Sequence, residues 1–379
     1  MDIKLFLDPV ASECVASDAS SSSFQESIFI NHTKMYELDG VDIVLLGVLD
    51  VRSEGATESS LVEFRKALYG LAKNTGTNRI LDLGNLRNGP SPADTRLRLM
   101  EVCEHLLSRN ILPIIIGGSH DMDIGQYRAY EAADKLVTLL NVDGYFDLDE
   151  RSDVKGHIAQ IIKHDPNYLF NYIHLGFQSY LVDSSQLGVL EELYFEVVRL
   201  GDIKGKVAEY EPYIRDADLM SFDLSAIQSI YCPGTFEPNV FGLTGEEAAQ
   251  ICWYAGHNDK LTSLGIYGYN AATDHADAKT AQVVAAMVWY FIEGYYHRKG
   301  DKNFMSNDYT TYEVAFENRP ETVRFYKSKM SEKWWLEVPD ENSDSIFLRN
   351  RMIPCSYTDY ETAMKGELPA RWLKAMSAN

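Results

Sequence analysis

Positive charge is scarce in this sequence: 35 lysines and arginines stand against 56 aspartates and glutamates, for a formal net charge of -21. So acidic a chain repels nucleic acids and anionic membranes, and we expect neither as a partner. Cysteine is also scarce, with five residues in 379 and no CxxC pair, which argues against a zinc ribbon or a disulfide framework. We therefore expect a protein of the reducing cytoplasm.

Long apolar runs and phosphate-binding loops are missing as well. No apolar stretch is long enough to span a bilayer, and the N-terminus, MDIKLFLDPV, lacks the apolar core of a signal peptide. No GxGxxG or GxxxxGK[ST] motif follows the first apolar strand, which disfavours a nucleotide-binding domain. The 45% hydrophobic content is nevertheless ample for a buried core.

Short apolar segments alternate with helical ones along most of the chain. Strands are expected at 41–50, 79–86, 111–117, 136–142, 172–177, 219–225 and 261–270, and helices at 61–71, 95–110, 124–135, 158–162, 186–194, 245–255 and 279–296. This alternation predicts right-handed crossovers and a mostly parallel sheet with helices on both faces, a three-layer α/β/α fold.

The alternation stops near residue 300. We expect residues 1–300 to form the α/β domain and residues 301–379 to form a small C-terminal extension with short strands, packed on that domain. Trp334 and Trp335 lie at the centre of this polar and aromatic segment. The simplest interpretation is that they dock the extension on the main domain, and an active-site lid is the alternative.

Residues that can bind a metal occur where the predicted strands end. His120 follows the strand that begins at Ile111, Asp143 and Asp147 follow the next one, and Asp223 lies on a later one. Because the carboxyl ends of parallel strands meet at one sheet edge, we expect this imidazole and the three carboxylates to lie together. Such a donor set suits Mn, Fe or Zn. The alternative is that they are turn, cap and hydrogen-bonding residues without a metal.

Three segments in this order resemble the signatures of the ureohydrolases, the family of arginase, agmatinase and formimidoylglutamase. GGSHD (117–121) resembles the first signature, DGYFD (143–147) the second, and SFDLSAIQSIYCPGTFEPNVFGLT (221–244) the third. The resemblance spans about residues 41–293 and leans toward formimidoylglutamase because of YFDL and LGFQ. It implies an arginase-like fold, a hydrolase acting on a small-molecule amidine or guanidino substrate, bound manganese, and a homo-oligomer.

The resemblance also implies a metal-ligand set. Family members bind two Mn²⁺ ions, and by position the first would be held by His120, Asp143, Asp147 and Asp223, the first and last of these aspartates also bridging to the second ion. The two remaining ligands of that second ion are replaced by Tyr145 and Ser225, which are poor ligands for Mn²⁺. We therefore predict one ion rather than two, with a site without metal as the alternative.

Other family positions are altered as well. Gly268 stands where the family usually carries a Glu that orients the substrate, and Asp149 replaces an Arg that would suit an acidic substrate. Lys155 is the best match to a proton-shuttling His of some members. His157 lies close to that position and is either catalytic or an ordinary surface residue. Tyr145 is a candidate hydrogen-bond donor to the charge that develops during the reaction.

Two functions remain open. The first is a metal-dependent hydrolase of linear amidines that works with one metal or a remodelled second site, with turnover below that of arginase because one polarising charge is lost. The second is a non-catalytic member of the family, a pseudoenzyme that keeps the fold for assembly or ligand sensing. Hydrolytic activity is what separates the two.

Overall fold

The computed structural model describes residues 3–57, 59–301, 307–316, 322–339 and 351–377, and its main body is built around one ten-stranded sheet. The strands are β1 (Leu7–Asp8), β2 (Phe29–Ile30), β3 (Ile43–Val48), β4 (Ile80–Leu86), β5 (Leu112–Gly117), β6 (Val137–Val142), β7 (Leu169–Phe177), β8 (Glu196–Arg199), β9 (Leu219–Asp223) and β10 (Ser263–Tyr267). Their order is β1-β4-β3-β5-β10-β9-β6-β7-β8, with β2 beside β4. Among these strands only β1 runs antiparallel to its neighbour, so the sheet is mostly parallel, as predicted.

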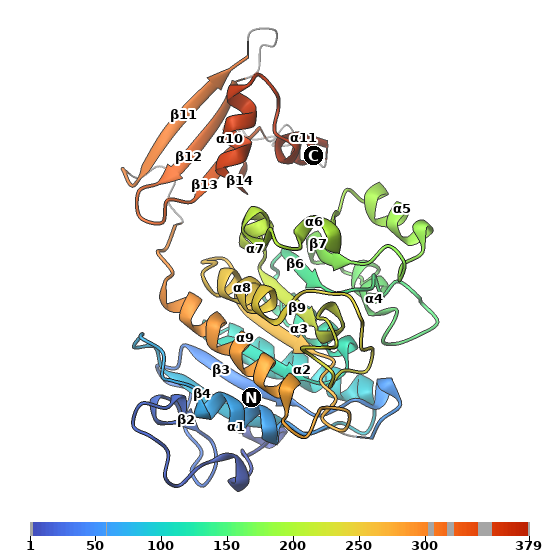
Figure 1. Cartoon of the computed structure of the whole chain (residues 1–379), viewed down its shortest axis with the longest axis vertical. Coiled ribbons are helices and arrows are strands. Elements are labelled where there is room, and N and C mark those ends of the chain that lie inside the picture. Colours follow the sequence, from blue (N-terminus) through green and yellow to red (C-terminus); the bar gives the residue numbers. More distant parts are fainter. Residues whose placement is uncertain (1–2, 58, 302–306, 317–321, 340–350, 378–379) are drawn as a thin grey trace.

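Helices cover both faces of this sheet, which confirms the predicted three-layer fold (Figure 1). One layer contains α1 (Val62–Gly70), α6 (Leu200–Ile203), α7 (Glu211–Arg215), α8 (Gly245–Gly256) and α9 (Lys279–Tyr296). The other contains α2 (Pro92–Leu107), α3 (Asp123–Arg128), α4 (His157–Ile162) and α5 (Ser184–Glu192). In the part of the chain that is described, no helix is both long and apolar enough to cross a membrane.

Short 3₁₀ turns connect these elements: η1 (Ile3–Phe6), η2 (Ser12–Cys14), η3 (Phe24–Ser27), η4 (Arg52–Glu54), η5 (His120–Met122), η6 (Glu131–Ala133), η7 (Val207–Tyr210) and η8 (Leu224–Ala226). The predicted helix 279–296 coincides with α9, whereas the helix predicted at 124–135 ends at Arg128. It ends early because Tyr130 turns inward, where its hydroxyl hydrogen-bonds Thr262 and Ser263. The short strand β8 was not expected.

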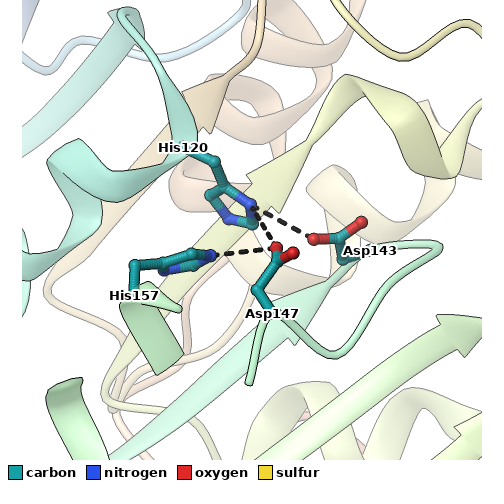
Figure 2. Close-up of side chains that lie close together, drawn as sticks. All are labelled: His120, Asp143, Asp147 and His157. Atoms are coloured by element: carbon teal, nitrogen blue, oxygen red, sulfur yellow. Dashed lines mark hydrogen bonds and ion pairs between the residues drawn. The ribbon is translucent and has the colours of Figure 1, made fainter. Parts of the chain in front are cut away.

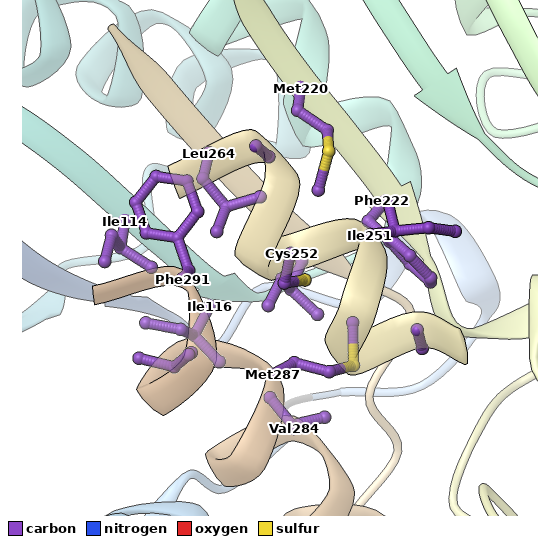
Figure 3. Close-up of a cluster of buried hydrophobic side chains, with 14 of the residues drawn as sticks. Ile114, Ile116, Met220, Phe222, Ile251, Cys252, Leu264, Val284, Met287 and Phe291 are labelled. Carbon is purple, nitrogen blue, oxygen red and sulfur yellow. The ribbon is translucent and has the colours of Figure 1, made fainter. Parts of the chain in front are cut away.

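The central strands are buried on both sides, as a covered parallel sheet requires. Figure 3 shows the largest part of this core, where the middle of the sheet meets α8 and α9. Its members include Ile114, Ile116, Met220, Phe222 and Leu264 from the strands and Ile251, Cys252, Val284, Met287 and Phe291 from the two helices. This packing holds the carboxyl ends of the central strands in a fixed arrangement.

A second, antiparallel sheet follows the main body. It contains β11 (Tyr309–Ala315), β12 (Thr322–Ser328), β13 (Trp334–Val338) and β14 (Arg351–Cys355) in that order, followed by α10 (Tyr357–Met364) and α11 (Ala370–Ser377). This C-terminal unit has its own hydrophobic cluster, in which the Trp334 ring stacks on Tyr312 and Tyr360. Figure 1 shows the unit at one end of the molecule, on the side of α7.

Arg215 of α7 joins the C-terminal unit to the main body. Its Nη1 donates to the backbone oxygen of Trp334 at 3.0 Å, and its Nη2 donates to that of Cys355 at 3.1 Å. The guanidinium also lies 4.5 Å from the centre of the Trp335 ring. Trp335 thus contacts the main body through a cation–π interaction, and Trp334 does so through its backbone oxygen.

We expect Arg215→Ala to loosen the C-terminal unit, because it removes two hydrogen bonds from a charged donor to the backbone of β13 and β14 together with the ring contact. The expected loss of unfolding free energy is about 2–4 kcal/mol, measured by thermal unfolding together with limited proteolysis between α9 and β11. Arg324→Ala is the matched control, because Arg324 forms an exposed ion pair with Glu313 inside the unit. Equal stability and protease resistance of the two variants would contradict the assignment.

Candidate metal centre

The predicted ligands lie at the carboxyl edge of neighbouring central strands. His120 begins η5 just after β5, Asp223 ends β9, and Asp143 directly follows β6, with Asp147 four residues later. Since β5, β10, β9 and β6 are adjacent in the sheet, their ends converge on one place. The structure therefore brings together all four residues that the sequence singled out.

The four side chains face one another closely. His120 Nδ1 lies 3.2 Å from Asp143 Oδ2, 3.5 Å from Asp147 Oδ2 and 3.6 Å from Asp223 Oδ2; Figure 2 shows the first two of these contacts. Donor atoms that share one ion at about 2.1 Å lie about 3.0–3.5 Å apart. The spacing of these atoms thus suits a single ion between them.

The surroundings of His120 favour the tautomer that a metal ligand needs. Ser221 Oγ donates its proton to Asp123 Oδ2 at 3.1 Å and lies 2.9 Å from His120 Nε2, so it accepts a hydrogen bond from that nitrogen. The lone pair of neutral His120 is then on Nδ1, the atom that faces the carboxylates. Asp143 Oδ2 is buried and, despite its proximity to Nδ1, makes no hydrogen bond. An imidazole lone pair and carboxylate oxygens repel one another unless a cation lies between them.

The pKa values of His120, Asp143 and Asp147 are shifted because these ionisable groups are crowded together. Burial alone lowers the pKa of His120, but Asp223, Asp143 and Asp147 raise it well above its usual range. Burial and the charge of Asp147 raise the pKa of Asp143. The pKa of Asp147 is lowered despite burial, because the imidazoles of His120 and His157 lie beside its carboxylate and favour its charged form. Positive charge is thus strongly favoured at the centre of this cluster.

The second carboxylate oxygens of Asp143 and Asp223 accept hydrogen bonds from the protein itself. Asp143 Oδ1 accepts hydrogen bonds from Ser225 Oγ at 2.8 Å and from the backbone N–H of Tyr145 at 3.1 Å. Asp223 Oδ1 accepts the backbone N–H of Ser225 at 2.7 Å. Hydrogen bonds therefore engage the oxygen of each of these aspartates that is not the one facing His120.

The Tyr145 hydroxyl is turned to a different partner. It donates to Asn239 Oδ1 at 3.3 Å, and Asn239 Nδ2 in turn donates to the backbone oxygen of Ser225. The ring borders the site, with Lys155 Nζ 5.6 Å from its centre. Tyr145 thus joins Asn239 and Ser225 in one network that fixes the altered half of the site.

His157 is fully buried, so the interpretation of it as a surface residue is wrong. Its Nδ1 lies 2.8 Å from Asp123 Oδ1 and its Nε2 3.1 Å from Asp147 Oδ2 (Figure 2). Burial lowers its pKa, but Asp123 raises it to about 9. Both ring nitrogens are engaged by carboxylates, which leaves no nitrogen free to relay a proton. His157 therefore positions Asp147, whose backbone is in the left-handed region at φ 50°.

A purely geometric grouping of donor atoms within 4.8 Å of one another selects His120, Asp143, Asp147 and His157, with His157 in place of Asp223. Asp223 remains the predicted ligand, because its Oδ2 faces His120 Nδ1, whereas the two nitrogens of His157 face Asp123 and Asp147 and its ring packs 4.2 Å from that of His120. His157 is the supporting residue that orients that ligand.

Gly268 follows β10 at the same edge with φ 83°, a conformation that favours glycine. A Cβ atom there would lie 2.7 Å from Asp223 Oδ2. A larger residue at this position would therefore strain the backbone and have to displace the Asp223 carboxylate.

The cavity at this edge is small, about 20 Å³, which is room for one ion or one water molecule. It is lined by Glu54, His120, Asp143, Tyr145, Asp147, Val154, Lys155, Asp223, Ser225, Thr235, Phe236, Glu237 and Gly268. Glu54, Asp123 and Glu237 were not expected from the sequence. Only the position of Glu54 after the strand that begins near Val41 could have pointed to this edge.

Comparison with known proteins supports these assignments at the level of family and fold. The model of the arginase family matches residues 52–293. A formimidoylglutamase of Staphylococcus carnosus is 27% identical over 280 residues, which is 69% of this chain and 89% of that protein. Among solved structures, Trypanosoma cruzi formiminoglutamase with Mn²⁺ aligns at a TM-score of 0.65 and 19% identity, over 73% of this chain and 100% of that chain. Formimidoylglutamase from Bacillus subtilis aligns at a TM-score of 0.65 and 16% identity, over 79% of this chain and 99% of that chain.

We expect His157→Gln to weaken Mn²⁺ binding about 10–100-fold, because Asp147 then loses the imidazole that orients it. Isothermal calorimetry with the metal-free protein measures this. His164→Gln serves as control, since His164 pairs with Glu131 and lies outside the cavity. An unchanged dissociation constant in His157→Gln would remove the positioning role from this residue.

Proposed function

Because this chain belongs to the arginase family, we propose that it is a metal-dependent hydrolase of a C–N bond in a linear amidine or guanidino compound. One observation carries the proposal: His120 Nδ1 faces carboxylate oxygens of Asp143, Asp147 and Asp223 at 3.2–3.6 Å. The formimidoylglutamase relatives, and the Mn²⁺ in the T. cruzi structure, favour Mn²⁺ as the ion.

We propose one ion rather than two. The donor set of one imidazole and three carboxylates suits Mn²⁺, whereas the second position offers a phenol and a serine hydroxyl. The hydrogen bonds of Ser225 and Tyr145 to Asp143 Oδ1, and of Ser225 to Asp223 Oδ1, support this count. So does a cavity of about 20 Å³.

A divalent ion bound by His120, Asp143, Asp147 and Asp223 supplies a Lewis acid that lowers the pKa of a water molecule and polarises the amidine carbon. The protein's own groups keep the donors in place: Ser221 holds the His120 ring, and His157 holds the Asp147 carboxylate. Val154 and Phe236 line the cavity with apolar surface, which limits hydration and strengthens the charge interactions inside it.

A non-catalytic role is the second candidate. Tyr145, Ser225 and Gly268 stand where two metal ligands and a substrate-orienting acid are expected, and all three lie on the cavity wall. These replacements remove groups that activate and orient the reactants while leaving the fold and the first ligand set intact. A protein that senses an amidine or a metal without turning over substrate would need no more than this.

A hydrolysis assay on the Mn²⁺-loaded protein separates the two candidates. The panel contains formimidoylglutamate, arginine, agmatine and guanidino acids, with release of formamide, urea or ammonia as the readout. We expect slow turnover of at least one compound and its loss in Asp143→Ala. Glu150→Gln is the control, because this nearby exposed acid pairs with Lys163 and does not line the cavity. No turnover across the panel would favour the non-catalytic role.

Metal analysis tests the ion count independently of activity. We expect about one Mn²⁺ per chain in the loaded wild-type protein, and about two in the double variant Tyr145→His with Ser225→Asp, which supplies two second-site ligands. Ser225→Ala alone removes the hydrogen bond to Asp143 without adding a ligand, so this variant should still bind about one Mn²⁺ per chain. Two ions in the wild-type protein, or none after loading, would contradict the proposed site.

A further inference from the structure

Glu54 is an ionisable group at the cavity for which the proposed chemistry gives no role. It is half-buried in η4, and within the described parts of the chain no hydrogen bond or ion pair reaches its side chain. Burial, together with the nearby carboxylates of Asp223 and Glu237, raises its pKa to about 7. A carboxylate placed among other carboxylates without a partner is stabilised by a cation that enters beside it.

The backbone that carries Glu54 is firmly held. The Arg52 guanidinium binds both oxygens of the buried Asp50, and Ser53 Oγ donates to Asp121 Oδ2 at 3.0 Å. Asp121 also pairs with Arg96. With both preceding residues anchored in the protein, Glu54 is kept on the cavity wall.

Glu54 lies at the open side of the cavity. The ligand Asp143 is 1% exposed, whereas Glu54 and Glu237 are partly exposed and line the same cavity. An amidine group that reaches the ligands from solvent would place the rest of its molecule, here called the substrate arm, at a rim that contains these two acids and the exposed Lys155.

The charge around the substrate arm is negative. The cavity wall contains five carboxylates and one lysine, and that lysine, Lys155, is paired with Glu237 at 2.5 Å. A divalent ion would leave one negative charge on the three ligand carboxylates, and Glu54 adds another. No arginine lines the cavity among the described residues, so nothing there can bind a carboxylate as a bidentate partner.

We propose that Glu54 determines specificity, selecting amidine or guanidine substrates with a positively charged arm and rejecting those with a carboxylate arm. This inference rests on the proposed function of the same site. It departs from the acidic compound named in the formimidoylglutamase relatives. A unit charge on Glu54 near the substrate arm, in a partly buried setting, changes the relative affinity about five- to tenfold.

Two guanidines of equal chain length provide the test: agmatine, whose arm ends in an ammonium group, and 4-guanidinobutanoate, whose arm ends in a carboxylate. Dissociation constants are measured by calorimetry with the Mn²⁺-loaded protein at pH 8, where Glu54 is ionised. We expect agmatine to bind at least about tenfold more tightly than 4-guanidinobutanoate. This preference should become smaller at high salt, because salt screens the charge interaction. Glu54→Gln should reduce this preference about five- to tenfold, and Glu54→Lys should reverse it.

Glu150→Gln is the matched control, because it makes the same charge change at an exposed residue that pairs with Lys163 outside the cavity. Equal affinity for the two guanidines in the wild-type protein, an unchanged preference in Glu54→Gln, or no binding of either compound overturns the inference. If Glu54→Gln does not fold, the relative affinities of the wild-type protein and of Glu54→Lys for the two guanidines still test the inference.

The binding measurement also separates the two proposals. The expected preference without any turnover would leave the specificity role standing and refute hydrolysis. Turnover of formimidoylglutamate with no preference between the two guanidines would support hydrolysis and refute the specificity role of Glu54.

Discussion

The mutual repulsion of buried carboxylates at one sheet edge is the constraint on which this site depends. Asp143, Asp147 and Asp223 point oxygens at the same nitrogen of His120, and each of these groups alone would be costly to bury. Positive charge among them, on the imidazole or on a bound cation, makes the arrangement favourable. The packed parallel sheet holds the groups together, because the ends of its central strands cannot move apart without disrupting the core.

A second constraint concerns the other half of the site. The outer oxygens of Asp143 and Asp223 accept hydrogen bonds from Ser225 and from the backbone of Tyr145, which is the basis for proposing one ion rather than two. The altered half of the site is therefore an ordered hydrogen-bond network, with Asn239 linking the Tyr145 hydroxyl to the backbone of Ser225. A site remodelled in this way is compatible with slow catalysis and with binding alone.

Residues around the predicted ligands orient them and set the charge near the cavity opening. His157 and Ser221 orient two ligands through Asp123, a buried carboxylate that contacts both of them. Glu54 places a further charge where a substrate must pass. In the proposed function a metal would fix where an amidine binds, and the outer acids would select the molecule that carries it. Among the described residues of the C-terminal unit, which Arg215 helps to attach, none lines the cavity.

The amino-acid sequence by itself determined the layered fold, through its alternating apolar segments, and it predicted that His120, Asp143, Asp147 and Asp223 lie together at strand ends. It also revealed the replacements at Tyr145 and Ser225. Only the tertiary structure decided that His157 is buried against Asp123, that Ser225 closes the bridging oxygen, and that Glu54 stands at the opening. These facts depend on side chains from segments far apart in the chain, whose orientation is set by packing and leaves no local pattern in the sequence.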